Sequence, residues 1–305
     1  MKIAVFGTGG VGGYFGGRLA ASGEDVRFVA RGAHLQAIRK GGLRIKSALG
    51  DVTIDAAQAT DDPADIGHAD IALVAVKLYD TEDAARAMKP LVGPQTTVVS
   101  FQNGVGARDV FSAAFGAERV IGGTTSIAAV IGEPGVITHT GTMASMAFGE
   151  WDGNRSARTE SLLAACEKAG IDVTLSPNIN GAIWSKFVFL AAFSGITSHF
   201  RLPIGPIRED EEKRAMFRDA IAETFAVGRA KGVSLSDNLV EKRMVFADGL
   251  PEEMYSSMYH DLAAGKRIEV KWLSGAVVDM GEDLGIDTPT HRIFLEALLP
   301  FSEGT

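Results

Sequence analysis

A glycine-rich segment near the N-terminus has the composition and spacing of a phosphate-binding loop. Gly7-Thr8-Gly9-Gly10-Val11-Gly12 has the spacing G-x-G-x-x-G, between a strand expected at Lys2 to Phe6 and a helix expected near residues 11 to 22. The first glycine allows a tight turn, the second lets the backbone approach phosphates, and the third lets helix and strand pack closely. A glycine-rich turn without a ligand needs no fixed spacing, so we expect a dinucleotide site here.

An arginine occupies the place where a site for NAD would have an acidic residue. That carboxylate is expected about 20 residues after the glycines, where it holds the ribose hydroxyls. Here the expected strand Asp25 to Ala30 is followed by Arg31. A guanidinium suits a 2′-phosphate, so we predict that Arg31 contacts NADPH and that NADPH is preferred over NADH. The alternative is an exposed loop arginine without a ligand.

Two charged residues in the C-terminal half are candidates for proton transfer. Hydride transfer from a dinucleotide to a ketone leaves negative charge on oxygen, which requires a proton donor. Lys186 lies in the apolar stretch Ile183 to Leu190, where burial would lower its pKa and make it a better acid near neutrality. Glu269 lies between two apolar residues and needs a partner if it is buried. We hypothesise that the two pair across helices; a lysine that extends to water and a solvated glutamate are the alternatives.

Two polar residues directly follow expected strands. Lys77 comes after Ile71 to Val76, and Asn103 comes after Thr97 to Phe101. Doubly wound sheets bind ligands outside the carboxyl ends of their strands. We therefore expect Lys77 and Asn103 to face a ligand, with strand-end solvation and an Asn-Gly turn or helix cap as alternatives.

The elements that must position these residues change in kind near residue 177. Up to about residue 150, short apolar runs alternate with helical stretches, including those near 81 to 89 and 106 to 114, which is typical of a parallel sheet covered by helices. Extra strands are expected in Arg119 to Gly149 and around Val173, with a helix at 155 to 169 between them.

After Ser176-Pro177-Asn178 the apolar residues recur three and four apart. This spacing predicts helices at about 179–199, 212–231, 236–247, 254–264, 269–284 and 290–299. We therefore predict an α/β fold, with a doubly wound dinucleotide-binding domain at 1–177 and an all-helical substrate and catalytic domain at 178–305.

Composition argues against several classes of protein. The formal net charge of -8 disfavours a nucleic-acid binder. The longest apolar runs fall short of the roughly 20 residues of a membrane helix, and no signal peptide is visible, so we expect no membrane span and a cytoplasmic location. The single cysteine, Cys166, excludes an intrachain disulfide. The six histidines show no metal-ligand spacing, so we expect no metal.

Taken together, these motifs resemble those of the ketopantoate reductase (2-dehydropantoate 2-reductase) family over nearly the whole chain. The resemblance rests on the glycine loop, on Val76-Lys77, Gln102-Asn103-Gly104 and Trp184-Ser185-Lys186, and on Ser256-Ser257-Met258 followed by Asp261 and Glu269. It implies a Rossmann-type first domain and the NADPH-dependent reduction of a small 2-keto acid, ketopantoate, to pantoate in pantothenate biosynthesis.

The resemblance also implies a role for each matching residue. Lys186 would donate the proton to the keto oxygen, and Glu269 would fix both the lysine and the cofactor. The remaining contacts would be made by Lys77 to the cofactor, Asn103 to cofactor and substrate, Ala129 to the nicotinamide and Ser257 to the substrate carboxylate.

One departure from the family concerns the substrate. Family members often carry asparagines four and eight residues after the lysine, where this chain has Leu190 and Ser194. Ser194 remains a substrate-binding candidate, but a lost hydrogen-bonding partner weakens recognition. A reductase of another 2-keto acid or a β-hydroxyacid dehydrogenase is therefore one alternative, and a non-catalytic NADPH-sensing module is another. The oligomeric state, including a homodimer, is left open.

Overall fold

The chain divides into two units, and each is described by itself. In the computed structural model, which describes residues 1–305, the units are Met1–Ala182 and Ile183–Thr305. The division falls a few residues after the boundary that the sequence predicts before Asn178, because the helix that begins at Ile179 continues into the second unit. The boundary at 177–178 stays a prediction.

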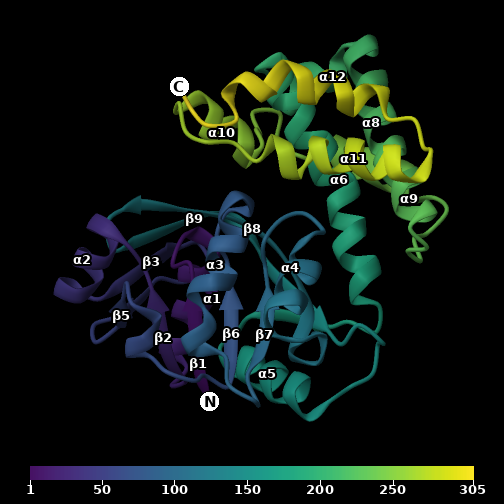
Figure 1. Ribbon diagram of the computed structural model, residues 1–305. Coiled ribbons are helices and arrows are strands. Elements are labelled where there is room, and N and C mark those ends of the chain that lie inside the picture. The colour runs from purple at the N-terminus through teal and green to yellow at the C-terminus, as the bar shows by residue number, and fades with distance from the viewer. The chain divides into compact units, whose positions relative to one another are not determined.

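A parallel sheet with the strand order β5-β2-β1-β6-β7-β8 forms the frame of the first unit. Counted among themselves, these strands have the order 3-2-1-4-5-6 of a doubly wound dinucleotide-binding fold. Figure 1 shows β1, β2, β6 and β7 side by side. The bounds are β1 (Lys2–Phe6), β2 (Asp25–Val29), β5 (Gln58–Thr60), β6 (Ile71–Val74), β7 (Thr97–Ser100) and β8 (Val120–Glu133).

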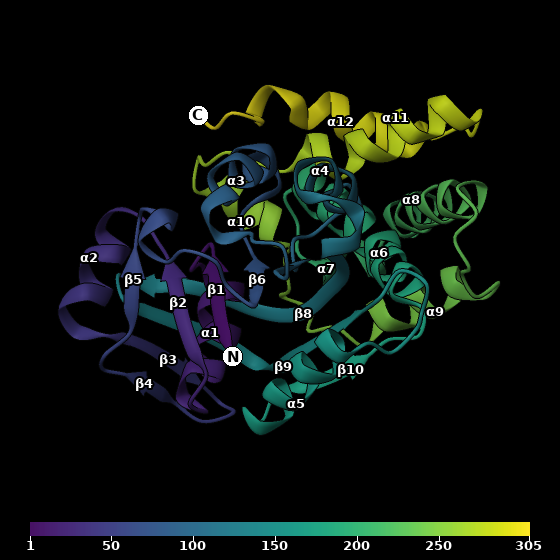
Figure 2. The ribbon, with the colours of Figure 1, turned by 60° about the horizontal axis from the view of Figure 1, so that its bottom comes forward.

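A second group of strands begins where β8 leaves the parallel sheet. Past Ile121, β8 pairs antiparallel with β9 (Val136–Gly149), and the two form the long ribbon seen in Figure 2. Strands β3 (Leu43–Ser47) and β10 (Asp172–Leu175) pair with β9, and β4 (Val52–Ile54) pairs with β3. The expected strands within Arg119 to Gly149 and around Val173 are confirmed.

Helices cover both faces of the parallel sheet. Alternate residues of β1 enter different cores: Ile3 and Val5 pack with Phe15, whereas Ala4 and Phe6 pack with Phe111. A strand buried on both faces in this way is typical of parallel sheets. The helices of this unit are α1 (Gly10–Ala21), α2 (Gly32–Gly41), α3 (Thr81–Ala87), α4 (Ala107–Phe115) and α5 (Ala157–Lys168).

Helix α1 lies between the two groups of strands, and its glycines make this possible. A Cβ atom on Gly16 would lie 2.7 Å from Val5 of β1. Cβ atoms on Gly13 and Gly17 would lie 2.7 Å and 2.6 Å from Ile137 of β9 and Ile45 of β3. Real Cβ contacts are not that short, so the helix approaches both groups only because these positions lack side chains.

The second unit consists of helices, which confirms the predicted all-helical character of this region. Figure 1 shows them in teal to yellow. The long helix near 179–199 and the helices near 212–231 and 290–299 are confirmed, whereas the helix predicted at 269–284 begins only at Ser274. The bounds are α6 (Ile179–Phe200), α7 (Ile204–Glu209), α8 (Glu211–Ala230), α9 (Leu239–Asp248), α10 (Ser257–Ala263), α11 (Ser274–Leu284) and α12 (Pro289–Leu298).

Helix α6 is longer than any of the uninterrupted apolar runs in the sequence. It has 22 residues, and its most apolar stretch of 18 residues has a mean hydropathy of 1.4, so by length and composition alone it could cross a membrane. Within the structure, 67% of its most apolar window is buried. Such burial is also found in the core helix of a soluble protein, so the helix is weak support for a membrane span.

Candidate active site

The glycine loop, residues 7 to 12, is fixed against the end of β2. Gly7 has a φ of +99°, a conformation that favours glycine. The backbone N–H groups of Gly7 and Thr8 donate to the carbonyl oxygen of Val29 at 3.3 Å and 3.2 Å, and the Thr8 hydroxyl donates to the same oxygen at 2.8 Å. The loop is therefore held next to the segment that carries Arg31.

The three glycines of the motif have different surroundings. A Cβ on Gly12 would overlap the carbonyl oxygen of Gly7, so this glycine closes the turn. A Cβ on Gly9 would have no heavy atom within 4 Å, so Gly9 exposes its backbone to open space. No side chain caps the N-terminus of α1, and no acidic residue lies in its first turn. Exposed backbone at an uncapped helix start suits a phosphate.

Gly10 has a packing role that the motif did not indicate. A Cβ on Gly10 would overlap the carbonyl oxygen of Ala129 in β8. Ala129, which the family resemblance assigns to the cofactor pocket, therefore lies directly against the first residue of α1. Val11 is half-buried at the same end of the helix.

Arg31, Lys77 and Asn103 each follow a strand of the parallel sheet, as predicted. Arg31 is exposed, forms no ion pair, and precedes α2. Lys77 and Asn103 are half-buried and follow the neighbouring strands β6 and β7. The Gln102 side chain joins these two loops by donating to Thr81 Oγ1 at 2.8 Å and to the Lys77 carbonyl oxygen at 3.4 Å.

In the second unit, Lys186 lies on α6 among buried aromatic side chains. Trp184 and Phe187 beside it are 4% and 1% exposed, and Lys186 itself is half-buried. Burial lowers the pKa of Lys186 to about 8, while the charge of Glu269 acts in the opposite direction. Glu269 is only 3% exposed. The structure thus brings the two residues of the predicted pair within electrostatic reach of each other.

One apolar and two polar side chains follow Lys186 along α6. Leu190, one turn on, is half-buried, and Ser194, two turns on, is 1% exposed. The hydroxyls of Ser194 and Ser198 are buried without a hydrogen-bond partner. A buried polar group without a partner is costly, so a bound molecule that offers a polar atom would satisfy these hydroxyls.

Ser256 and Ser257 lie at the start of α10, and Ser256 contacts Thr197 of α6, a residue that the sequence motifs did not single out. Ser257 is exposed at the first residue of α10, and the preceding Ser256 is buried and caps the helix by accepting from the Tyr259 N–H at 3.1 Å. Ser256 also hydrogen-bonds Thr197 of α6 at 2.8 Å. Thr197 follows Lys186 by eleven residues on the same helix, and this spacing was the available signal.

Two of the histidines and the cysteine are held in structural roles. His291 is fully buried and hydrogen-bonds Thr224 at 2.7 Å, and His139 hydrogen-bonds Ser47 at 2.8 Å. Burial raises the pKa of the Cys166 thiol to about 12, which makes it a poor nucleophile. No group of three or more His, Cys, Asp or Glu side chains could hold a metal ion.

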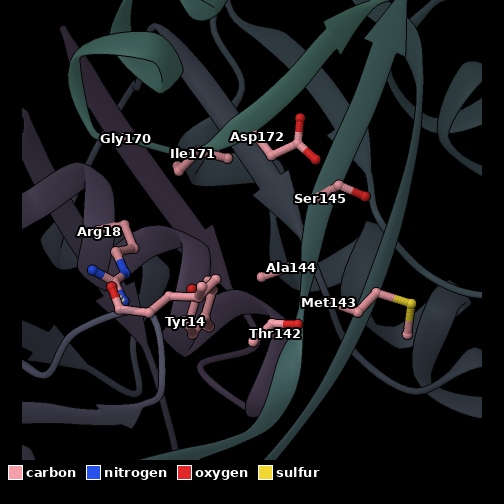
Figure 3. Close-up of a pocket in the computed structure, with 10 residues that line it drawn as sticks. Tyr14, Arg18, Thr142, Met143, Ala144, Ser145, Gly170, Ile171 and Asp172 are labelled. Atoms are coloured by element: carbon pink, nitrogen blue, oxygen red, sulfur yellow. Dashed lines mark hydrogen bonds between the residues drawn. The ribbon is translucent and has the colours of Figure 1, made fainter.

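One pocket of the first unit lies apart from all the predicted site residues. It has a volume of about 310 Å³ and lies between α1 and β9, with Arg18, Ser145 and Asp172 among the lining residues drawn in Figure 3. Arg18 stacks over Tyr14 and donates to the carbonyl oxygen of Gly50 at 2.6 Å. Since it contains no part of the glycine loop, we do not assign the dinucleotide to it.

The sheet order and the glycine loop define an α/β protein of the dinucleotide-binding class. Two family models match the chain: "Ketopantoate reductase PanE/ApbA" at residues 3–153 and "Ketopantoate reductase PanE/ApbA C terminal" at residues 178–300. The chain belongs to this family of pyridine-nucleotide-dependent reductases, which act on a small keto acid. The resemblance seen in the motifs and the predicted fold class are both confirmed.

Individual relatives agree over almost their entire length. The chain is 33% identical to an oxidoreductase of Bacillus subtilis, YkpB, with 95% of each protein covered, and 33% identical to the 2-dehydropantoate 2-reductase of Halobacterium salinarum, with 96% of each covered. The crystal structure of a PanE/ApbA family ketopantoate reductase from Ralstonia eutropha superposes with a TM-score of 0.91 at 34% identity, covering 99% of this chain and 98% of that one.

Proposed function

We propose that the protein reduces ketopantoate to pantoate, with NADPH as the reductant and Lys186 as the proton donor. The observation that carries the proposal is the state of Lys186: a half-buried lysine whose pKa is lowered to about 8, within electrostatic reach of the buried Glu269, in a chain of this family. A pKa close to neutrality is what a general acid at physiological pH requires.

The residues of the first unit fit a dinucleotide phosphate. Gly9 faces open space, the start of α1 is uncapped, and Arg31 is exposed with no carboxylate paired to it. We assign the pyrophosphate to the glycine loop, the 2′-phosphate to Arg31, and further cofactor contacts to Lys77, Asn103 and Ala129. When bound, NADPH supplies the hydride that reduces the keto carbon.

The residues of the second unit account for the proton and the substrate. As the new C–H bond forms, Lys186 Nζ transfers its proton to the keto oxygen, and the neutral amine then takes a proton from water. The carboxylate of Glu269 favours the ammonium form that must be present before the reaction. We assign the substrate carboxylate to Ser257 and a further polar group of the substrate to Ser194, with Asn103 as an additional substrate contact.

The proposal is tested by a panel of 2-keto acids. The purified protein is mixed with NADPH and, in turn, with ketopantoate, 2-ketoisovalerate and pyruvate, and the loss of NADPH absorbance is followed. We expect ketopantoate to give the highest kcat/KM. An absence of turnover with ketopantoate would remove this substrate, whatever the other acids show.

A second candidate is a reductase of a different 2-keto acid. Leu190 favours it, because an apolar side chain one turn from Lys186 offers no hydrogen bond to a substrate hydroxyl. The Bacillus relative, which is named only as an oxidoreductase, is compatible with it. A higher kcat/KM for 2-ketoisovalerate than for ketopantoate would favour this candidate, because the former lacks the hydroxyl.

The choice of NADPH depends on Arg31. We expect Arg31→Ala to raise the KM for NADPH roughly 10- to 100-fold, because the variant loses one charge-assisted hydrogen bond to the 2′-phosphate. The KM for NADH should change little, because NADH lacks this phosphate. Arg27→Ala is the matched control, because Arg27 lies on β2 itself and pairs with Asp25 at 2.6 Å. An unchanged ratio of the two KM values in Arg31→Ala would remove Arg31 from the cofactor site.

The pathway and location follow from the proposed reaction. We assign the protein to pantothenate biosynthesis in the cytoplasm. A buried Cys166 without a disulfide and the largely buried helix α6 are compatible with that location.

A further inference from the structure

We infer that Thr197 and Ser256 are positioning residues: their hydrogen bond sets the place of Ser257 relative to Lys186 and so the affinity for the keto acid. The inference rests on the proposed function, in which Ser257 binds the substrate carboxylate. It concerns residues of the second unit alone. Neither Thr197 nor Ser256 needs to touch the substrate for this role.

Three hydrogen bonds connect the pair to the backbone of α6 and α10. Thr197 Oγ1 lies 2.7 Å from the Phe193 carbonyl oxygen and 2.8 Å from Ser256 Oγ. The Thr197 hydroxyl is the donor in both contacts, so its one proton is shared between the Phe193 carbonyl oxygen and Ser256 Oγ. Ser256 Oγ in turn accepts from the Tyr259 N–H. The chain of bonds therefore runs from the backbone of α10 through both hydroxyls to the backbone of α6.

Both hydroxyls are sealed from water. Thr197 is 0% exposed and Ser256 is 2% exposed. When one partner is removed, water has no access to replace it, and the other hydroxyl is left without its bond. The bond therefore defines one position for the start of α10 on α6.

Thr197 and Ser256 are connected through the chain to the proposed proton donor and to the proposed substrate-binding serine. Thr197 follows Lys186 by eleven residues, about three turns of helix, so both lie on the same side of α6. Ser256 is directly followed by Ser257. Met258 and Leu262 are 1% and 6% exposed, so apolar packing holds α10 in place without the hydroxyl bond. Loss of the bond should therefore shift Ser257 rather than release the helix.

The test compares Thr197→Val with Thr197→Ser. Valine keeps the shape and lacks the hydroxyl, whereas serine restores it. We expect Thr197→Val to raise the KM for ketopantoate roughly tenfold, because small misplacements of binding groups are costly, while kcat and the KM for NADPH change less than about twofold. Thr197→Ser should return the KM close to the wild-type value.

The matched control is Thr224→Val. Thr224 is a fully buried helical threonine of the same unit, and its hydroxyl bonds the Ala220 carbonyl oxygen and His291. A general loss of packing would raise the KM in both valine variants, and that result would overturn the inference. So would a Thr197→Val protein whose KM stays within about twofold of wild type.

Two further variants keep the test decisive. If Thr197→Val does not fold, Ser256→Ala removes the same bond from the other side and should raise the same KM. Ser257→Ala separates the inference from the proposed function. If Ser257→Ala raises the KM and Thr197→Val does not, only the inference fails. If Ser257→Ala leaves the KM unchanged, the assignment of the carboxylate to Ser257 fails, and the inference fails with it.

Discussion

Replacement of Lys186 by alanine is expected to lower kcat by about 10²- to 10⁴-fold, the usual contribution of a general acid. Without the ammonium, the negative charge that develops on the keto oxygen has no proton donor beside it. The KM for NADPH should change little, because the groups assigned to the cofactor phosphates lie in the glycine loop and at Arg31. Steady-state kinetics of the folded variant measures both quantities.

The control for this variant is Lys271→Ala. Lys271 belongs to the same unit, is 43% exposed and pairs with Glu303 at 2.9 Å, so its loss should leave kcat unchanged. A Lys186→Ala protein that retains wild-type turnover with every accepted keto acid would show that another group supplies the proton. The assignments of the fold and of the family would be unaffected.

The same assignment fixes the pH dependence of kcat. Lys186 acts in its protonated form, and its pKa is lowered to about 8 by burial, so kcat should fall as the pH rises above about 8. Glu269 raises this pKa, so Glu269→Gln should move the alkaline limb to lower pH. An alkaline limb near the ordinary lysine value, or a shift to higher pH in Glu269→Gln, would contradict the assignment.

The parallel sheet could be predicted because its strands are apolar runs with turn residues at their ends. Strand β6, with all four residues buried, is the clearest case. The short strand β3 was missed, although Leu43 and Ile45 alternate with Arg44 and Lys46 in burial as in a half-buried strand. Its partners on β9 lie about ninety residues later in the chain, and no local pattern reveals a pairing at that distance.

The candidate site shows the same limit. The glycine loop and Lys186 could be found because each is unusual within its own segment of sequence. Other features depend on residues that are far apart in the chain. Examples are the burial of Glu269, the contact between Gly10 and Ala129, and the hydrogen bond between Thr197 and Ser256. Such contacts depend on how helices and strands pack, which residue types alone do not determine.

An added methyl group should have different effects at the adjacent glycines Gly9 and Gly10: it should weaken NADPH binding at Gly9 and lower the stability of the fold at Gly10. In Gly9→Ala the methyl enters open space, at a φ of -83° that alanine readily adopts. The free energy of unfolding should therefore fall by no more than about 1 kcal/mol, because a helix N-cap prefers glycine to alanine by about this amount. The methyl would occupy the space assigned to the pyrophosphate, so the Kd for NADPH should rise at least about tenfold.

In Gly10→Ala the methyl overlaps the carbonyl oxygen of Ala129, and neither backbone can move without disturbing α1 or β8. Overpacking of this kind should lower the free energy of unfolding by about 3 kcal/mol.

Urea unfolding of the free proteins measures the loss of stability, and NADPH titration measures the loss of binding, so the two effects are separated. Gly13→Ala provides an intermediate case, because its methyl would lie 2.7 Å from the buried Ile137 side chain and not against a backbone carbonyl. If Gly9→Ala bound NADPH as tightly as the wild type, the open space above Gly9 would not be the phosphate site, and the glycine loop would be explained by the packing of α1 between its two groups of strands.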